Sequence, residues 1–151
     1  RGSPQRVFAI VGDGEMNEGT NWEGLLVANA YQLDNLVVVM DRNEFQANIR
    51  TEDLIPLEPL EDKFRAFGAN SQTVDGHDFQ AMHDVFQRLP FEKRRASVVI
   101  AKTRRGKGLP SIEARADRWF CNFTSTEIES LRKELHGEAK AKIESETLVV
   151  R

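Results

Sequence analysis

The chain has 151 residues, 40% of them hydrophobic and 30% charged, and these fractions are typical of a globular domain with its own core. A formal net charge of −3, with no long basic run, excludes a general attraction to nucleic acid. The apolar stretches have only the length of strands, so we expect no membrane span. The single cysteine excludes an intrachain disulfide and favours a reducing, cytoplasmic location.

The first predicted element is a buried parallel strand over Val7–Val11, which leads through Gly12-Asp13-Gly14 into a helix over residues 18–33. The two glycines lack a β-carbon, so they permit a tight turn and a close approach of the backbone to a ligand. Asp13 supplies a hard anionic oxygen, which suits Mg²⁺ or Ca²⁺. The start of the helix favours an anion. This segment therefore predicts a site for a metal and a phosphorylated cofactor.

A second predicted strand over Leu36–Met40 ends just before Asn43, which follows Asp13 by 30 residues. Strand, turn, helix and returning strand form one right-handed βαβ unit of about that length. Because the carboxyl ends of parallel strands meet at one edge, Asn43 can offer its amide oxygen to a cation beside Asp13. The alternative is that Gly12-Asp13-Gly14 is merely a turn and Asn43 merely a helix cap.

The rest of the chain continues the alternation of helices and strands. After a connection with Pro56 and Pro59, the pattern predicts in turn a short helix over 60–67, a weaker strand over 70–74, an amphipathic helix carrying Phe79, Met82, Phe86 and Leu89, and a strand over 97–101. This order is typical of an α/β fold with a doubly wound, mostly parallel sheet. A capping box at Thr124 predicts a last helix, with Ile128, Leu131 and Leu135 on one face and Gly137 at its end.

The motif resembles that of thiamin-diphosphate enzymes, in which Gly-Asp-Gly is followed about thirty residues later by asparagine. The finer pattern over residues 12–23 and 33–36 resembles transketolases, and above all the N-terminal halves of transketolases split over two chains. Further similarity lies in residues 57–68, 74–78 and 102–108, so the resemblance covers about residues 7 to 110.

The resemblance implies a role for seven residues. It assigns cofactor binding to Gly12, Asp13, Gly14, Glu15, Asn43 and Phe45, and Mg²⁺ binding to the side chains of Asp13 and Asn43 and the backbone carbonyl of Phe45. Glu18 resembles the family glutamate that lies at the dimer interface and links two active sites, and we place it with the catalytic residues. Its plainer interpretation is an acid in the first helical turn, favoured by the helix dipole; both interpretations can hold.

Residues 102–108 resemble the glycine-rich loop that precedes an active-site closing segment, and their alternative is a solvated basic turn. Transketolases commonly carry a histidine after this loop, often near a tryptophan. Here Trp119 is followed by Phe120, Cys121 and Asn122 instead. This departure indicates a different acceptor or donor from the standard sugar phosphates.

The resemblance also predicts the organisation of the chain: a single partial diphosphate-binding module over 1–151, with a core over 7–110, an active-site-flanking segment and helix over 111–136, and a tail over 137–151. The family places about a hundred residues before this motif, and a pyrimidine-binding module elsewhere. We therefore expect companion chains to supply both, and the isolated chain to be inactive. We also expect exposed apolar surface, because the chain enters the motif strand at once, and hence association with other chains.

The implied function is a thiamin-diphosphate- and Mg²⁺-dependent transfer of a two-carbon ketol unit between sugars or sugar phosphates. The alternatives are a non-catalytic assembly or regulatory subunit with the same fold, or a related enzyme with an altered substrate. Other side chains are expected to be structural: Trp22 in packing, His77 in hydrogen bonds to its local backbone, His83 on the polar side of a helix, and His136 at a helix end.

Overall fold

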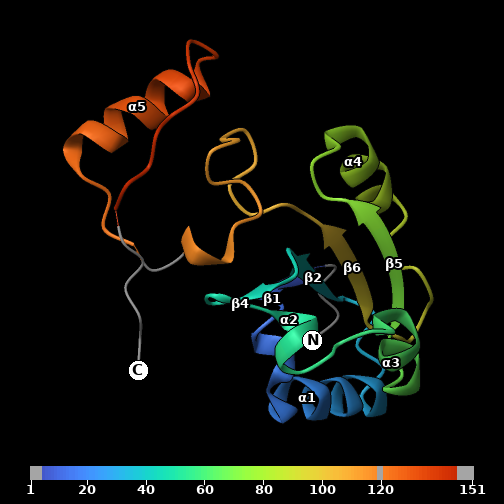
Figure 1. The fold of residues 1–151 in the computed structure, drawn as a ribbon. Coiled ribbons are helices and arrows are strands. Elements are labelled where there is room, and N and C mark those ends of the chain that lie inside the picture. The colour runs from blue at the N-terminus through green and yellow to red at the C-terminus, as the bar shows by residue number, and fades with distance from the viewer. Residues whose placement is uncertain (1–4, 119–120, 146–151) are drawn as a thin grey trace.

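The computed structural model describes residues 5–118 and 121–145, and its centre is a parallel sheet (Figure 1). The four strands lie in the order β1 (Val7–Gly12), β2 (Leu36–Arg42), β6 (Ser97–Lys102) and β5 (Asn70–Asp75). Every pair of neighbours in this order is parallel. All four predicted strands are confirmed, each one or two residues longer than its apolar run.

The strand register brings the carboxyl ends of three strands to one edge of the sheet. Gly12 of β1 pairs with Asp41 of β2, and Asp41 pairs in turn with Ala101 of β6. Asp13 and Asn43 leave their strands within two residues of these pairs. The edge of the sheet at which the sequence predicts a ligand site is therefore formed as expected.

Helices cover both faces of the sheet, so the predicted doubly wound arrangement is confirmed. On one face lie α1 (Gly19–Ala30) and α3 (Leu60–Ala66), and on the other lies α4 (Phe79–Gln87) (Figure 1). The first face packs a large cluster around Leu25, Phe64 and Ile100, and the second packs a smaller one that includes Val37, Val85, Leu89 and Val99. Burial of these side chains stabilises the sheet from both sides.

Two helical faces differ from their predictions. Helix α1 ends at Ala30 rather than at residue 33. Its residues Trp22, Leu25, Leu26 and Ala30 have the spacing of an apolar helix face, yet Leu26 is 50% exposed. Phe79, the first residue of α4, is 89% exposed. Amphipathic spacing shows which side chains share one face of a helix, but burial requires another part of the protein to cover that face. The described residues do not cover the helices at these two positions. Trp22 is packed as predicted, with its ring centroid 5.1 Å from that of Phe64.

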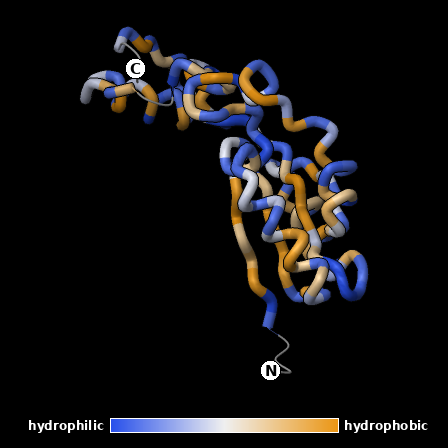
Figure 2. The backbone as a smooth tube through the Cα atoms, turned by 90° about the horizontal axis from the view of Figure 1, so that it is seen from below, coloured by the Kyte–Doolittle hydropathy of each residue, from blue (hydrophilic) through white to orange (hydrophobic). Residues whose placement is uncertain are grey.

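Strand β1 forms one edge of the sheet and is poorly covered, so the prediction that the strand over Val7–Val11 is buried is wrong. Its pairing places Phe8 beside Val37 and Ile10 beside Val39, on the face of α4. Phe8 is 51% exposed and Ile10 is 76% exposed. In Figure 2 this strand follows the N-terminal end as a hydrophobic stretch at the rim of the body. Exposed apolar surface is therefore present, and part of it lies on this strand.

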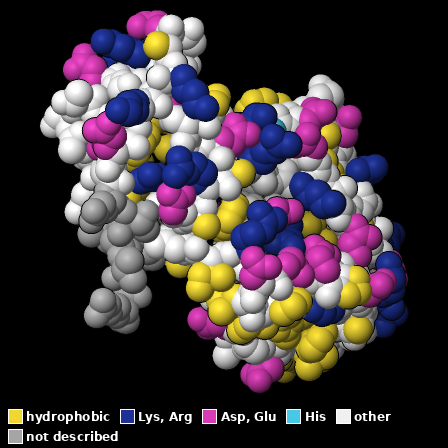
Figure 3. All heavy atoms as spheres, viewed as in Figure 1, with side chains coloured by type: hydrophobic (Ala, Val, Ile, Leu, Met, Phe, Trp, Pro, Cys, Tyr) yellow, Lys and Arg dark blue, Asp and Glu magenta, His cyan; other side chains and the backbone are white. Residues whose placement is uncertain are grey.

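Short elements surround the polar edge of the sheet. They are a 3₁₀ turn over Glu15–Asn17, a hairpin of β3 (Phe45–Gln46) and β4 (Ile49–Arg50), and the single-turn helix α2 (Thr51–Leu54). Figure 3 shows hydrophobic side chains gathered over the region of α1 and α2, where Leu54 and Ile55 are 44% and 52% exposed. No helix of the described residues is both long and apolar enough to span a membrane.

The last helix, α5 (Ser125–Leu135), stands away from the sheet and begins at the predicted capping box (Figure 1). His136 is its C-cap and Gly137 follows with φ 77°, as the sequence indicated. Its apolar face is incomplete, since Leu131 is buried but Ile128 and Leu135 are exposed. The chain then returns along the helix, where the amides of residues 144 and 145 donate to the Glu127 carboxylate.

Candidate functional site

An open pocket of about 820 Å³ lies at the carboxyl ends of β1 and β2. Its lining includes all seven residues that the sequence singled out: Gly12, Asp13, Gly14, Glu15, Glu18, Asn43 and Phe45. They come from two strand ends, the 3₁₀ turn, the start of α1 and the β3–β4 hairpin. The βαβ geometry thus brings together residues that are about 30 positions apart.

Asp13 is the most deeply buried of these side chains, at 1% exposure. Its Oδ2 accepts hydrogen bonds from Arg42 Nη1 at 2.7 Å and from the Thr51 hydroxyl at 3.2 Å. Its Oδ1 is buried and makes no hydrogen bond of ordinary geometry. Burial raises the pKa of Asp13, and the charge of Arg42 opposes that rise. Arg42 and Thr51 therefore hold one carboxylate oxygen, while the other is buried without a hydrogen-bond partner.

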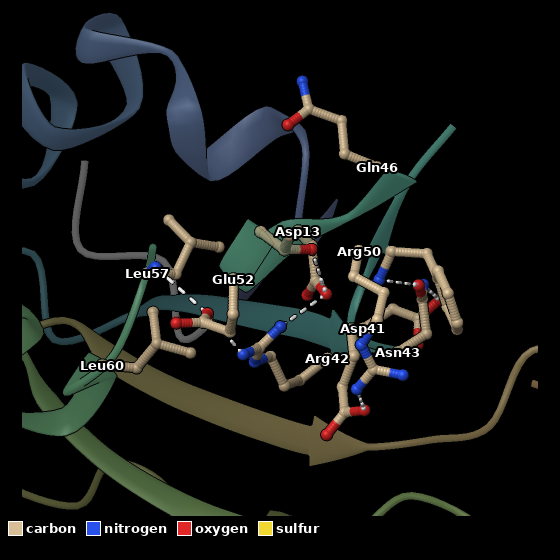
Figure 4. A network of polar contacts seen from close by, with 12 residues as sticks. Asp13, Asp41, Arg42, Asn43, Gln46, Arg50, Glu52, Leu57 and Leu60 are labelled. Carbon is tan, nitrogen blue, oxygen red and sulfur yellow. Dashed lines mark hydrogen bonds and ion pairs between the residues drawn. The ribbon is translucent and has the colours of Figure 1, made fainter. Parts of the chain in front are cut away.

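Arg42 ends β2 and is 4% exposed. Besides Asp13 it contacts Glu52, with Nη2 2.8 Å from Oε1 (Figure 4). It also contacts Glu58, with Nη2 3.1 Å from Oε1. These two acids extend from α2 and from the segment after it. The guanidinium is thus fixed by three carboxylates, and a planar fork of donors suits such an arrangement. Sequence reasoning gave Arg42 no role; the signal available was a charged residue at the end of an apolar strand.

Asn43 is oriented by two hydrogen bonds. Its Nδ2 donates to Asp41 Oδ2 at 3.0 Å, and its Oδ1 accepts from the Phe45 amide at 3.0 Å. The hydrogen-bond pattern thereby assigns which amide atom is the oxygen. Asp41 also accepts a hydrogen bond from the Thr103 hydroxyl. Because an amide oxygen has two lone pairs, Asn43 Oδ1 can still bind a cation.

The backbone beside Asn43 turns sharply. Glu44 has φ 71°, a left-handed conformation that is unfavourable for a residue with a side chain. Its carbonyl accepts the Thr51 amide at 2.9 Å, and Thr51 also bonds to Asp13. One contact network therefore fixes both the turn that carries Phe45 and the Asp13 carboxylate.

The two motif glycines do not adopt positive φ, so the turn itself does not require their conformational freedom. A β-carbon at Gly12 would have Glu15 Oε2 as its nearest neighbour, at 3.7 Å, so the space over the backbone is open. The Gly12 amide donates to that carboxylate at 2.7 Å. Gly12 thus leaves space beside its backbone, whereas a β-carbon at Gly14 would lie 2.9 Å from Gln46 Cγ, so glycine there permits the close approach of the β3–β4 hairpin.

The start of α1 differs from the sequence interpretation. The amides of Met16, Asn17 and Glu18 are already used in turn hydrogen bonds, and α1 begins only at Gly19. Glu18 is the N-cap residue, and its side chain makes no capping hydrogen bond. It is exposed at the wall of the pocket. The helix therefore presents fewer free amides to the pocket than a direct turn-to-helix connection would.

The sequence did not identify Arg105, which the structure places in the pocket wall. Its Nη1 donates to the Ala47 carbonyl at 2.6 Å, and its guanidinium lies 4.9 Å from the centre of the Phe45 ring. Burial lowers the pKa of Arg105, with Asp41 and Asp13 acting in the opposite direction. The signal that could have found it was the basic run in residues 102–108. Those residues lie beside the pocket, so the alternative of a purely solvated turn does not describe Arg105.

The donor set fits a hard divalent cation. It comprises the unpartnered Asp13 Oδ1, the Asn43 amide oxygen and a backbone carbonyl of the hairpin, and oxygen ligands of these kinds suit Mg²⁺. Within residues 5–118 and 121–145, no three His, Cys, Asp or Glu side chains form a metal-binding group. The donor set named above contains only one carboxylate, so it is not a group of this kind.

The segment where the sequence lacks the expected histidine is described only in part. Trp119 and Phe120 lie outside the described residues. Cys121 is half-buried and Asn122 is exposed. Neither of these two residues lines the pocket described above.

The chain is similar to known proteins over most of its length. A family model described as "Transketolase, thiamine diphosphate binding domain" matches residues 3–149. The chain is 34% identical to a subunit of the apulose-4-phosphate transketolase of Actinobacillus succinogenes, over 91% of this chain and 49% of that protein. It is 37% identical to a 6-deoxy-6-sulfo-D-fructose transketolase subunit of a Clostridium species, over 70% of this chain and 38% of that protein. The chain thus spans half or less of the length of these two relatives.

Solved structures show the same fold. A transketolase of Pichia stipitis superposes with a TM-score of 0.76 at 20% identity, covering 87% of this chain and 19% of that one. A transketolase of Campylobacter jejuni superposes with a TM-score of 0.68 at 24% identity, covering 74% of this chain and 17% of that one.

Proposed function

Because the chain belongs to the transketolase family, in its thiamin-diphosphate-binding domain, we propose that it is the part of a transketolase-like enzyme that holds Mg²⁺ and the cofactor diphosphate. The observation that carries this proposal is the buried, unpartnered Oδ1 of Asp13 in a pocket that also contains Asn43. A purely structural domain gains nothing from a buried carboxylate oxygen without a hydrogen bond, which costs free energy.

Each pocket residue has a distinct part in the proposal. Asp13 Oδ1, Asn43 Oδ1 and the Phe45 carbonyl bind the cation, and the backbone of Gly12 and Gly14 lets the diphosphate approach closely. The Arg105 guanidinium adds a positive charge for the diphosphate. Glu15 also lines the pocket; its carboxylate accepts the Gly12 amide, so it leaves that amide when a diphosphate takes its place.

When bound, thiamin diphosphate supplies the carbanion chemistry that cleaves and forms the carbon–carbon bond. The residues of this chain orient the cofactor and balance its charge, which is the part of catalysis that a protein contributes to a cofactor enzyme. We propose that the reaction is the transfer of a two-carbon ketol unit between sugars or sugar derivatives. The relatives named for apulose-4-phosphate and for 6-deoxy-6-sulfo-D-fructose support a carbohydrate substrate with an anionic group.

Companion chains are part of the proposal. Two of the relatives are named as subunits of transketolases. The open face of β1, with Phe8 and Ile10 exposed, offers a surface for such a chain. Glu18, exposed at the pocket wall, is proposed to meet a neighbouring subunit and to link two active sites there. The substitution of the family histidine near Phe120–Asn122 is proposed to alter the substrate.

Native mass spectrometry of the protein as isolated, with added thiamin diphosphate and Mg²⁺, tests the proposal. We expect a complex with companion chains that holds one cofactor and one Mg²⁺ per site. If that complex binds the cofactor but transfers no ketol unit in an assay with a ketose donor and an aldehyde acceptor, the result would favour the assembly subunit. A complex without the cofactor would overturn the proposed binding function.

A further inference from the structure

The turn after β5 touches the loop that carries Arg105, through a histidine that the cofactor site does not include. The His77 Nε2 accepts the backbone N–H of Arg104 at 2.7 Å, across 27 residues of sequence. The sequence predicted hydrogen bonds between His77 and its local backbone; the imidazole instead bonds to a neighbour in space. Its role as an acceptor assigns the neutral tautomer with the proton on Nδ1.

Several contacts hold the turn against the loop. The Gly76 amide donates to the Lys102 carbonyl at 2.7 Å, and the His77 amide donates to Asp75 Oδ1 at 2.9 Å. A β-carbon at Gly76 would lie 2.6 Å from Thr103 Cγ2, so only glycine permits this approach. On its other side, the Thr103 amide donates to the Arg42 carbonyl at 3.1 Å. The imidazole is thus presented to the loop by a turn that is itself fixed.

The next residue after the hydrogen-bonded amide is Arg105. Its guanidinium reaches the Ala47 carbonyl and lies over the Phe45 ring, beside the expected ligands of the cation. The residue whose amide is held by His77 is therefore bonded directly to the residue whose guanidinium lines the pocket. We infer that His77 is a positioning residue, which fixes the Arg104 amide and thereby sets where Arg105 enters the cofactor pocket; this inference rests on the proposed function.

Three variants of the protein with its companion chains test the inference. His77→Leu removes the acceptor, and His77→Gln replaces it with a side-chain oxygen of similar reach. His83→Leu is the matched control, since His83 is an exposed histidine on α4. We expect His77→Leu to speed hydrogen exchange of the Arg104 amide and to weaken thiamin diphosphate binding about three- to tenfold, the effect of one hydrogen bond. His77→Gln should restore binding to within about twofold, and His83→Leu should bind as the wild type does.

A double-mutant cycle separates positioning from a general loss of structure. If His77 acts through Arg105, His77→Leu should weaken binding further by less than about twofold in an Arg105→Met background. Wild-type affinity for thiamin diphosphate in His77→Leu would overturn the inference while leaving the proposed function intact. The same holds if His77→Leu lowers that affinity as much in the Arg105→Met background as it does in the wild type. A wild-type complex that binds no thiamin diphosphate would instead overturn the proposed function, and the inference with it.

Discussion

Asp13 and Arg42 form a buried ion pair between the ends of two neighbouring strands, with Nη1 2.7 Å from Oδ2. The pair uses one carboxylate oxygen and leaves the other, Oδ1, without a hydrogen bond. Glu52 and Glu58 contact the same guanidinium. The arrangement fixes the carboxylate while keeping an anionic oxygen for a cation, so the stability of the strand ends and the proposed metal site depend on the same contacts.

Replacement of Arg42 by methionine should strongly destabilise the protein. The Asp13 carboxylate would remain buried without its cation, a change that costs about 3–5 kcal/mol in other proteins. Urea denaturation followed by circular dichroism measures the change in the free energy of unfolding. Arg65→Met is the control, because Arg65 and Asp62 form an exposed pair that contributes about 0–1 kcal/mol. Equal effects of the two substitutions would show that the buried pair is not structurally important.

Replacement of Asp13 by asparagine should abolish Mg²⁺-dependent cofactor binding with only a modest loss of stability. The amide keeps the shape and a hydrogen-bond acceptor for Arg42, but it removes the anionic ligand. We expect affinity for Mg²⁺ to fall more than about 100-fold, since the loss of partners outside the ligand shell alone costs about 10–100-fold. Titration of the complex with Mn²⁺, followed by electron paramagnetic resonance, gives the affinity. Asp62→Asn on the surface of α3 is the control. An unchanged affinity for Mn²⁺ in Asp13→Asn would show that Asp13 is not a metal ligand.

Replacement of Ile10 by arginine should prevent assembly with companion chains while leaving the fold in place. Ile10 is 76% exposed on the open face of β1, so a charge there meets solvent in the isolated chain but would be buried at an interface. Native mass spectrometry of the protein with its companion chains measures assembly. Phe79→Arg introduces the same charge at a residue that is 89% exposed on α4, beside the opposite edge of the sheet, and should leave assembly unchanged. If the Ile10 variant assembles normally, the companion chain binds elsewhere.

Replacement of Glu127 by glutamine should change the acid stability of the C-terminal segment. Backbone amides of Thr124, Ser145 and Glu144 donate to the carboxylate and lower the pKa of Glu127 from 4.5 to about 2. Because the folded pKa is the lower one, the contribution to stability is complete above about pH 4.5 and is lost as the pH falls toward 2. Hydrogen exchange at residues 144 and 145 should show this pH dependence in the wild type and lose it in Glu127→Gln. The same pH profile in both would contradict the assignment.

The strands and the motif edge were predictable because local patterns determine them. Continuous apolar runs indicated the strands, and parallel pairing places their ends together. The runs did not predict burial, because β1 lies at the edge of the sheet and is largely exposed. Helix faces were less predictable: Leu26 and Phe79 follow helical spacing but are exposed. Spacing shows which side chains share a face, whereas burial depends on whether another part of the structure covers that face.

By itself the sequence determined the parallel α/β fold and the placement of Asp13 and Asn43 at one edge of the sheet, because both follow from strand pattern and from the length of a βαβ unit. Only the tertiary structure decided that Arg42 holds one oxygen of Asp13, that Arg105 enters the pocket, and that His77 contacts the Arg104 amide. Those contacts join residues from separate strand ends and loops. Their geometry depends on side-chain rotamers and loop positions that no local pattern specifies, because the packed fold alone sets them.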